Sequence, residues 1–137
     1  MSLFVDTSVW SVALRRDTPS SMPEVQALRR ALVGGEIVAT TGLVLQELLQ
    51  GFAGPRARKD IIERFAALPL LMPDRMDHID AADLRNRCRR AGVQIGTIDA
   101  LLAQLCVRHE LTLLTADHDF SRIASHCPLT VWSQEAS

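Results

Sequence analysis

The chain has 137 residues, of which 47% are apolar and 23% charged. This length and composition predict one globular domain, residues 1–137, and exclude a disordered chain. No apolar run approaches the ~20 residues of a membrane span, and the N-terminus lacks the basic leader and apolar core of a signal peptide. The net charge of −1 does not by itself indicate a nucleic-acid-binding protein.

The cysteines and the basic residues give weaker indications. Cys88, Cys106 and Cys127 are odd in number and widely spaced, which excludes a disulfide framework and a CxxC metal motif. We therefore expect a reducing, cytoplasmic setting. Fourteen of the 15 basic residues are arginine, which suits bidentate phosphate contacts. A coding bias that replaces lysine by arginine would give the same composition, so the arginine content does not identify the ligand.

Short apolar runs alternate with amphipathic segments through the first half of the chain. The apolar spacing switches between the period of a strand and that of a helix, and Gly and Pro mark the boundaries. In chain order, this half predicts a strand at 2–6, helices at 7–16 and 24–35, a strand at 36–41, and helices at 42–52 and 55–68.

The second half continues the alternation. It predicts a strand at 69–72, helices at 75–92 and 97–110, a strand at 111–115, a short helix at 119–125 and a last strand at 129–132. Such alternation is typical of an α/β fold, in which helices cover both faces of a parallel sheet, here of four to five short strands. Ligands of these sheets bind outside the carboxyl ends of the strands, near the point where the strand order reverses.

Four acids follow strand ends or enter from covering helices: Asp6, Glu47, Asp99 and Asp117. Each has an ordinary explanation when taken alone. Asp6 could cap a helix, Asp99 could favour a helix N-terminus behind a Thr97 cap, and Asp117 could form an Asx turn. Glu47 is harder to explain, because it interrupts the apolar run "LVLQELL". All four can meet at one end of a parallel sheet.

Carboxylates that converge raise one another's pKa unless a cation neutralises them. Ligands that are all oxygen select hard cations, so we expect Mg²⁺ or Mn²⁺, and the lack of nearby His or Cys ligands argues against structural zinc. One or two such ions at a sheet end favour hydrolysis of a phosphodiester by metal-activated water. His118, between two acids, is expected to point away from them and not to act as a base.

Four segments in the same order and spacing carry a resemblance to a known family: "FVDTSVW", "TTGLVLQELLQGF", "GTIDALLAQLC" and "LLTADHDF". The chain resembles PIN-domain ribonucleases, and most closely VapC-type toxins of toxin–antitoxin pairs. The resemblance implies a three-layer α/β/α domain with an acidic pocket that binds Mg²⁺ or Mn²⁺ through Asp6, Glu47, Asp99 and Asp117. Family members often carry a further acid at the position of Asp119, which would touch the metal directly or through water.

The resemblance also assigns supporting roles to hydroxyls. Thr115 would orient carboxylates or water, and so would Thr7 and Ser8, although these two could equally form only a helix cap. Arg15 and Arg16, just past the first helix, are the arginines best placed to hold substrate phosphates.

The resulting hypothesis is a metal-dependent endoribonuclease that acts on RNA, forms a homodimer and is inhibited by a small cognate antitoxin. The antitoxin would lie in a groove formed in part by Trp10, Val12, Leu14 and apolar residues of 43–52, although a tryptophan at helical spacing is more often a plain core residue. Two alternatives within the family are a PIN nuclease for RNA processing without an antitoxin and a catalytically silent RNA-binding module. A phosphoacceptor receiver module is disfavoured, because it needs an acid at the end of the third strand and a late lysine, and the only lysine is Lys59.

Overall fold

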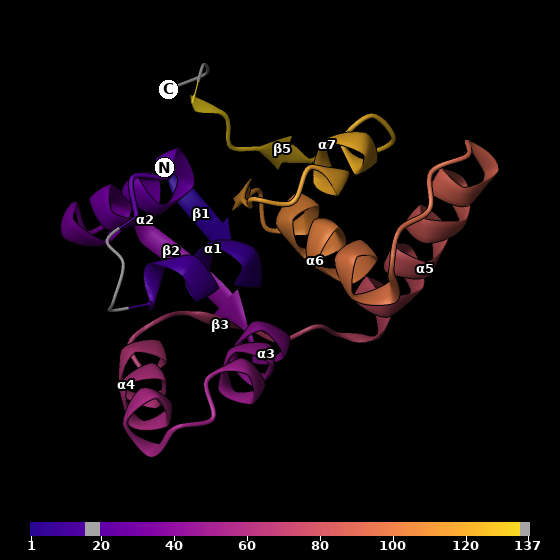
Figure 1. Cartoon of the computed structure of the whole chain (residues 1–137). Coiled ribbons are helices and arrows are strands. Elements are labelled where there is room, and N and C mark those ends of the chain that lie inside the picture. Colours follow the sequence, from indigo (N-terminus) through magenta and orange to yellow (C-terminus); the bar gives the residue numbers. More distant parts are fainter. Residues whose placement is uncertain (16–19, 135–137) are drawn as a thin grey trace.

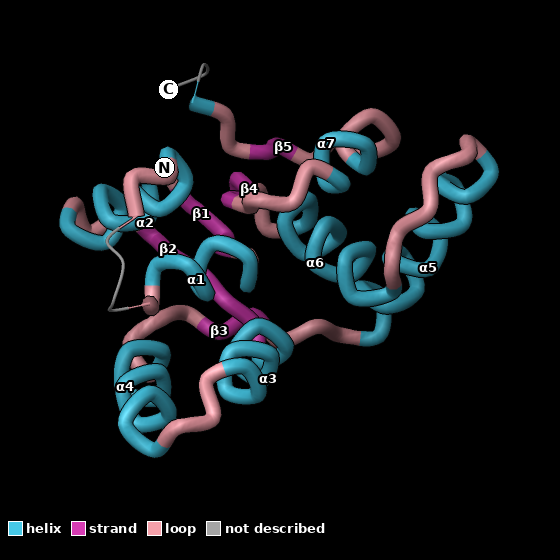
Figure 2. The backbone as a smooth tube through the Cα atoms, in the orientation of Figure 1, coloured by secondary structure: helices cyan, strands magenta, loops and turns pink. Residues whose placement is uncertain are grey.

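The structure is a computed structural model that describes residues 1–15 and 20–134. Within these residues the chain forms one fully parallel sheet with the strand order β3-β2-β1-β4-β5 (Figure 2). The strands are β1 (Ser2–Val5), β2 (Ile37–Thr41), β3 (Leu70–Leu71), β4 (Thr112–Leu114) and β5 (Thr130–Val131). The prediction of an α/β fold with four to five short parallel strands is confirmed.

The helices follow the predicted order, and local signals fix their ends. Pro23 and Pro55 occupy first-turn positions, where a missing N–H is tolerated. Gly35 takes a φ of 69° just past the second helix, a conformation that glycine adopts readily. The helices are α1 (Thr7–Ala13), α2 (Pro23–Val33), α3 (Gly42–Gly51), α4 (Pro55–Phe65), α5 (Arg75–Arg90), α6 (Thr97–Arg108) and α7 (Asp119–Ile123).

The helices form two layers around the sheet (Figure 1). The chain starts with the central strand β1 and adds β2 and β3 on one side of it. It then crosses back and adds β4 and β5 on the other side of β1. Because parallel crossovers are right-handed, α1 to α4 cover one face, and α5 to α7 cover the other. The strand order therefore reverses between β1 and β4, which places the carboxyl ends of these two strands at the expected ligand position.

The core lies on both faces of the sheet, and one of its densest parts lies between the central strands and α6. Leu3, Phe4 and Val5 of β1 are buried, and so is almost the whole middle of α6, including Cys106. Burial, and next the charge of Asp6, raises the pKa of the Cys106 thiol, so that this cysteine is an inert part of the core. No helix in the described part of the chain is both long enough and apolar enough to cross a membrane.

Trp10 belongs to the core and not to a surface groove. Its side chain is 4% exposed, and its ring packs against Phe65 of α4 with centroids 4.8 Å apart. The prediction that Trp10 lines a groove is therefore wrong, because the indole joins α1 to α4.

Candidate functional site

Asp6 lies at the strand-order reversal and is held by groups from both central strands. Its backbone N–H donates to the Leu114 carbonyl at 2.9 Å, which extends the β1–β4 ladder by one residue. Its Oδ2 accepts hydrogen bonds from the hydroxyls of Ser8, at 2.8 Å, and Thr115, at 2.9 Å. Asp6 occupies the N-cap position of α1, yet its side chain caps no amide. The carboxylate is oriented by hydroxyls instead.

Both hydroxyls are themselves fixed. The Ala116 N–H donates to Ser8 Oγ at 3.0 Å, and the Asp117 N–H donates to Thr115 Oγ1 at 3.0 Å. A hydroxyl has one proton, so each gives that proton to Asp6 while accepting from the backbone after β4. The β4–α7 turn thus sets the rotamer of Asp6. Ser8 makes no contact with the free amides of its own helix, so its hydroxyl is not a helix cap.

Thr7 does not share the position of Ser8. Its hydroxyl is buried and lacks a hydrogen-bond partner among the described residues. Successive residues of a helix point about 100° apart, so Thr7 and Ser8 cannot both face Asp6. The structure supports neither a carboxylate-orienting role nor a capping role for Thr7.

A pocket of about 370 Å³ opens beside Asp6 and is also lined by Glu47 and Asp99. Glu47 stands in the second turn of α3, and the start of that helix is fixed by Thr41, whose hydroxyl accepts from the Val44 N–H at 3.3 Å. Asp99 stands in the first turn of α6. The remaining pocket walls, which the sequence analysis did not single out for the site, are Gly96, Thr97, Ile98 and Leu102.

The N-terminus of α6 differs from the prediction in one respect. The N-cap is Gly96 and not Thr97, which is the first residue of the helix, and the cap lacks a side-chain hydrogen bond. A β-carbon added to Gly96 would lie 4.0 Å from Oδ2 of Asp99. The cap residue and the Asp99 carboxylate are therefore neighbours in the pocket wall.

Asp117 and Asp119 stand at the edge of this site. Asp117 Oδ1 accepts from the Asp119 N–H at 2.9 Å, which is the Asx turn that its position allowed. The Asp119 side chain is exposed, with Oδ1 4.0 Å from Nη1 of Arg122. His118 is exposed at the N-cap of α7 and is not part of the pocket wall.

The pKa of Asp99 shows that the negative charges of the other acids act on this carboxyl. Burial raises the pKa of the Asp99 carboxyl to about 6, and the charges of Asp6, Asp117, Asp119 and Glu47 add to this effect in that order. Among the described residues, no three carboxylate, imidazole or thiolate side chains form a ready-made coordination shell. The site is thus a set of converging, uncompensated negative charges.

Arg15, expected at the rim of the acidic pocket, does not line that pocket. Arg15 follows the far end of α1 and lines a different hollow, between α1 and α4. The axis of α1 rises about 1.5 Å per residue, which carries Arg15 away from the strand end that bears Asp6. Arg16 lies outside the described residues.

The PIN domain family model matches residues 3–125 of the chain. The chain belongs to the PIN domain family. Among curated relatives, the VapC ribonuclease Mb1587 of Mycobacterium bovis and the ribonuclease VapC11 of Mycobacterium tuberculosis are each 28% identical over 124 residues. Those matches span 89% of this chain and 91% of each relative. The predicted resemblance to PIN-domain ribonucleases is confirmed.

Solved structures show the same fold. VapBC2 of Rickettsia felis, bound to a DNA fragment from its promoter, matches with a TM-score of 0.74 and 20% identity, over 96% of this chain and 98% of that one. The toxin VapC20 of Mycobacterium tuberculosis, which cleaves the sarcin-ricin loop, matches with a TM-score of 0.64 and 20% identity, over 88% of this chain and 93% of that one.

Proposed function

We propose that this protein is an endoribonuclease of the VapC type, the toxin of a toxin–antitoxin pair, which hydrolyses phosphodiester bonds of RNA. The observation that carries the proposal is the convergence of four acids from three other segments on Asp99, at the strand-order reversal of a PIN fold. The curated relatives named as VapC ribonucleases support the same reaction.

The proposal includes a divalent cation, Mg²⁺ or Mn²⁺. The donor set fits such an ion, because it offers carboxylate oxygens only, and these select hard cations. The pKa of Asp99, which burial raises first and the neighbouring carboxylates raise further, fits it as well. The residues that would hold the ion are Asp6, Glu47, Asp99 and Asp117, with Asp119 as a fifth acid acting directly or through water. A bound ion supplies activation of water and balances charge on the phosphate.

The residues of the chain divide the remaining work in this proposal. Asp6 is the fixed member, because two hydroxyls hold one of its oxygens. Glu47 is exposed in the second turn of α3, where it can position the attacking water or serve as a ligand. Asp99 changes its protonation near neutral pH, so the charge of the pocket depends on pH in the working range.

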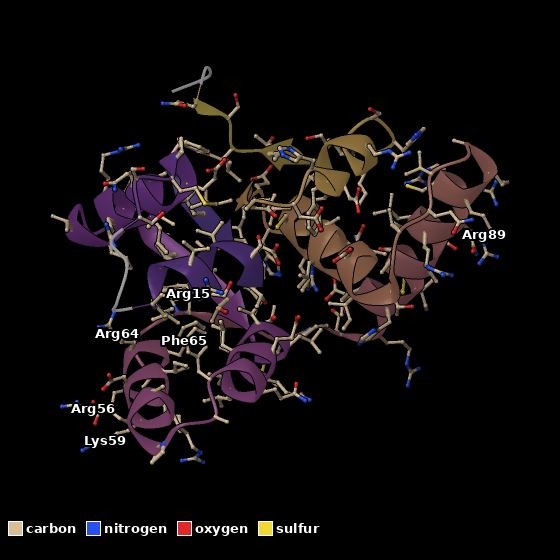
Figure 3. All side chains as sticks on the ribbon, viewed as in Figure 1. Arg15, Arg56, Lys59, Arg64, Phe65 and Arg89 are labelled. Atoms are coloured by element: carbon tan, nitrogen blue, oxygen red, sulfur yellow. The ribbon has the colours of Figure 1, made fainter. Side chains whose placement is uncertain are left out.

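Basic helices at both ends of the molecule are the proposed contacts to the RNA backbone. Arg56, Lys59 and Arg64 lie on α4 at one end, and Arg89 lies on α5 at the other end (Figure 3). Arginine and lysine on these helices would hold phosphates that the acidic pocket alone repels. This assignment replaces the expected role of Arg15, which lines another hollow.

The proposed antitoxin site is the hollow between the end of α1 and α4, with a volume of about 530 Å³. Leu14, Phe52 and Ile61 give it an apolar lining, and arginines 15, 56 and 64 stand among its walls. A partner segment that carries apolar side chains beside acidic ones complements this surface. The cognate antitoxin is the proposed occupant.

We further propose a homodimer and a cytoplasmic location. Met72, Met76 and Ile79 expose 77%, 55% and 46% of their surface at the start of α5, and together they offer an apolar strip to a second copy. The free cysteines Cys88, Cys106 and Cys127 fit a reducing compartment.

The test is cleavage of end-labelled total RNA by the purified protein with Mg²⁺, with Mn²⁺ and with excess EDTA. We expect discrete cuts that require metal and disappear in Asp6→Asn. The matched control is Asp83→Asn, which makes the same change at an exposed acid of α5 outside the pocket. Binding of Mn²⁺, followed by titration calorimetry, should weaken in Asp6→Asn and not in Asp83→Asn. Cleavage that resists EDTA, or that survives in Asp6→Asn, would contradict the proposal.

A further inference from the structure

A second hollow of about 410 Å³ lies between α5 and α6, next to the acidic pocket. One wall is a single face of α5, with the spacing i, i+3, i+4, i+7 and i+8: His78, Ala81, Ala82, Arg85 and Asn86. The facing wall comes from the first turns of α6 and from Leu43 at the start of α3.

The lining combines a flat apolar floor with polar groups at fixed places. Ala81, Ala82 and Ala100 are too short to fill the space between the two helices, which leaves the hollow open. Arg85 is anchored, because its Nε donates to the Ile95 carbonyl at 3.0 Å. The volume falls in the range of small-ligand pockets, and such pockets typically pair apolar walls with a few placed polar groups.

The hollow adjoins the acidic pocket directly. Thr97 and Ile98 line both spaces, and Asp99 follows them in the same turn of α6. Thr97 and Ile98 are therefore the wall that separates the hollow from the acidic pocket. A molecule bound in the hollow contacts this wall, and a group attached to it can reach past these two side chains into the acidic pocket.

We propose that this hollow binds one nucleobase of the RNA, beside the phosphate that is cleaved, and so selects the cut site. This inference rests on the proposed function. The alanine floor matches the apolar face of a base, and the Asn86 amide can pair with a base edge as donor and acceptor. The imidazole of His78 and the guanidinium of Arg85 are planar groups on which bases stack.

The occupant is a base and not a phosphate, because of the charges nearby. The hollow contributes one arginine, while the adjoining pocket holds the carboxylates of Asp6, Glu47 and Asp99. A neutral base can bind beside these acids without a cation, whereas a phosphate there needs one. Base binding and metal-dependent cleavage can therefore be measured separately.

The first experiment records ¹H–¹⁵N spectra during titration with adenosine, guanosine, cytidine and uridine, without divalent metal. We expect saturable shifts that centre on residues 78–86 and 97–101 and differ in strength among the four nucleosides. Ala82→Phe fills the hollow at an exposed position and should abolish these shifts. The matched control Ala91→Phe makes the same change at an exposed alanine at the end of α5, outside the hollow, and should keep them. Shifts located elsewhere, or none, would overturn the proposal.

The second experiment maps cut ends in total RNA for the same variants and for Asn86→Ala. We expect a preferred base at one fixed position from the cut, and this preference should be relaxed at least fivefold in Asn86→Ala and Ala82→Phe but kept in Ala91→Phe. Unchanged cut sites in both test variants would overturn the inference and leave the proposed nuclease intact. Absence of any metal-dependent cleavage by the wild type would instead count against the proposed function. If Ala82→Phe turns a dimer into a monomer with unchanged cut sites, a second copy covers the hollow, and the inference is wrong.

Discussion

The Thr115 hydroxyl donates a 2.9 Å hydrogen bond to the Asp6 carboxylate, although the two residues are 109 positions apart in the chain. The same hydroxyl accepts the Asp117 N–H at 3.0 Å, so one oxygen atom joins the end of β1 to the turn that carries the last acids of the site. Together with the parallel link through Ser8, this side chain sets the position of Asp6 relative to Asp117.

Thr115→Val should therefore damage both stability and activity. The substitution keeps the shape of the side chain but leaves a backbone N–H and a carboxylate oxygen short of a partner, which typically costs about 1–3 kcal/mol. We expect urea denaturation to show a loss of that size, and cleavage to fall at least tenfold. Thr112→Val, on the same strand and outside the Asp6 network, is the control and should change neither quantity appreciably. If the two substitutions had equal effects, the proposal that Thr115 orients Asp6 would be contradicted.

The raised pKa of Asp99 predicts how stability varies with pH. The folded pKa is about 6 and the ordinary value is 3.8, so the ionised carboxylate destabilises the fold above pH 6 and this penalty disappears as the pH falls toward 4. One pKa unit corresponds to about 1.4 kcal/mol, and the partial exposure of Asp99 reduces the effect, so we expect roughly 1–2 kcal/mol. Without divalent metal, the melting temperature measured by circular dichroism should rise as the pH is lowered from 7.5 to 5.5.

Asp99→Asn should remove most of that pH dependence and raise the melting temperature at pH 7.5 while abolishing cleavage. A stabilised but inactive variant is the signature of a charge that serves function and not folding. Asp83→Asn, on the exposed side of α5, should leave the pH profile as it is. A melting temperature of Asp99→Asn below that of the wild type at pH 7.5 would contradict the assignment.

Arg108→Ala tests the contact that joins the start of α5 to the end of α6. The Arg108 guanidinium pairs with Asp77, which is 1% exposed, and lies 3.1 Å from an oxygen of Asp74. The backbone hydrogen bond from Asp77 lowers the pKa of Asp74, and the charge of Arg108 lowers it further. Loss of the arginine leaves a buried carboxylate with only its capping contact. Because Arg108 is itself partly exposed, we expect a loss of roughly 1–3 kcal/mol in urea denaturation. Arg90→Ala, at the exposed end of α5, should cost under about 0.5 kcal/mol.

Charge reversal in the hollow between α1 and α4 tests the antitoxin proposal. Arg56→Glu combined with Arg64→Glu replaces two cations of the wall with anions. We expect the affinity for the protein encoded by the adjacent gene to fall at least tenfold in calorimetry, mainly through slower association. Charge reversal of Arg89, at the far end of α5, is the control for net charge. A partner that binds the double variant as tightly as the wild type must occupy another surface.

The alternation of apolar runs was sufficient to predict every strand and helix in order, because each run has the length and period of its element, and Pro or Gly marks several of the boundaries. "SLFV" and "TLL" read as strands since they are short, apolar and bounded, and they become β1 and β4. Asp6, Glu47 and Asp99 could be placed near one sheet end, because parallel strands share a direction. These local signals do not depend on which strands are neighbours.

Other features depend on tertiary contacts that local patterns do not contain. Thr97 looked like a helix cap, but Gly96 has the extended backbone of the N-cap. Arg15 looked close to the site in sequence, and the direction of α1 carries it to another surface. Trp10 was expected in a groove, but its ring packs against Phe65, a residue 55 positions later in the chain. Each of these details follows from the packing of one element against another, which requires the strand order β3-β2-β1-β4-β5.

That strand order has a consequence for how the protein is made. β1 lies at the centre of the sheet and is translated well before its partner β4. Asp6 is held in place only when Thr115 has been synthesised. A nascent chain that ends before Thr115 therefore lacks the hydroxyl that orients Asp6, so the site cannot assemble until the β4–α7 turn has been translated.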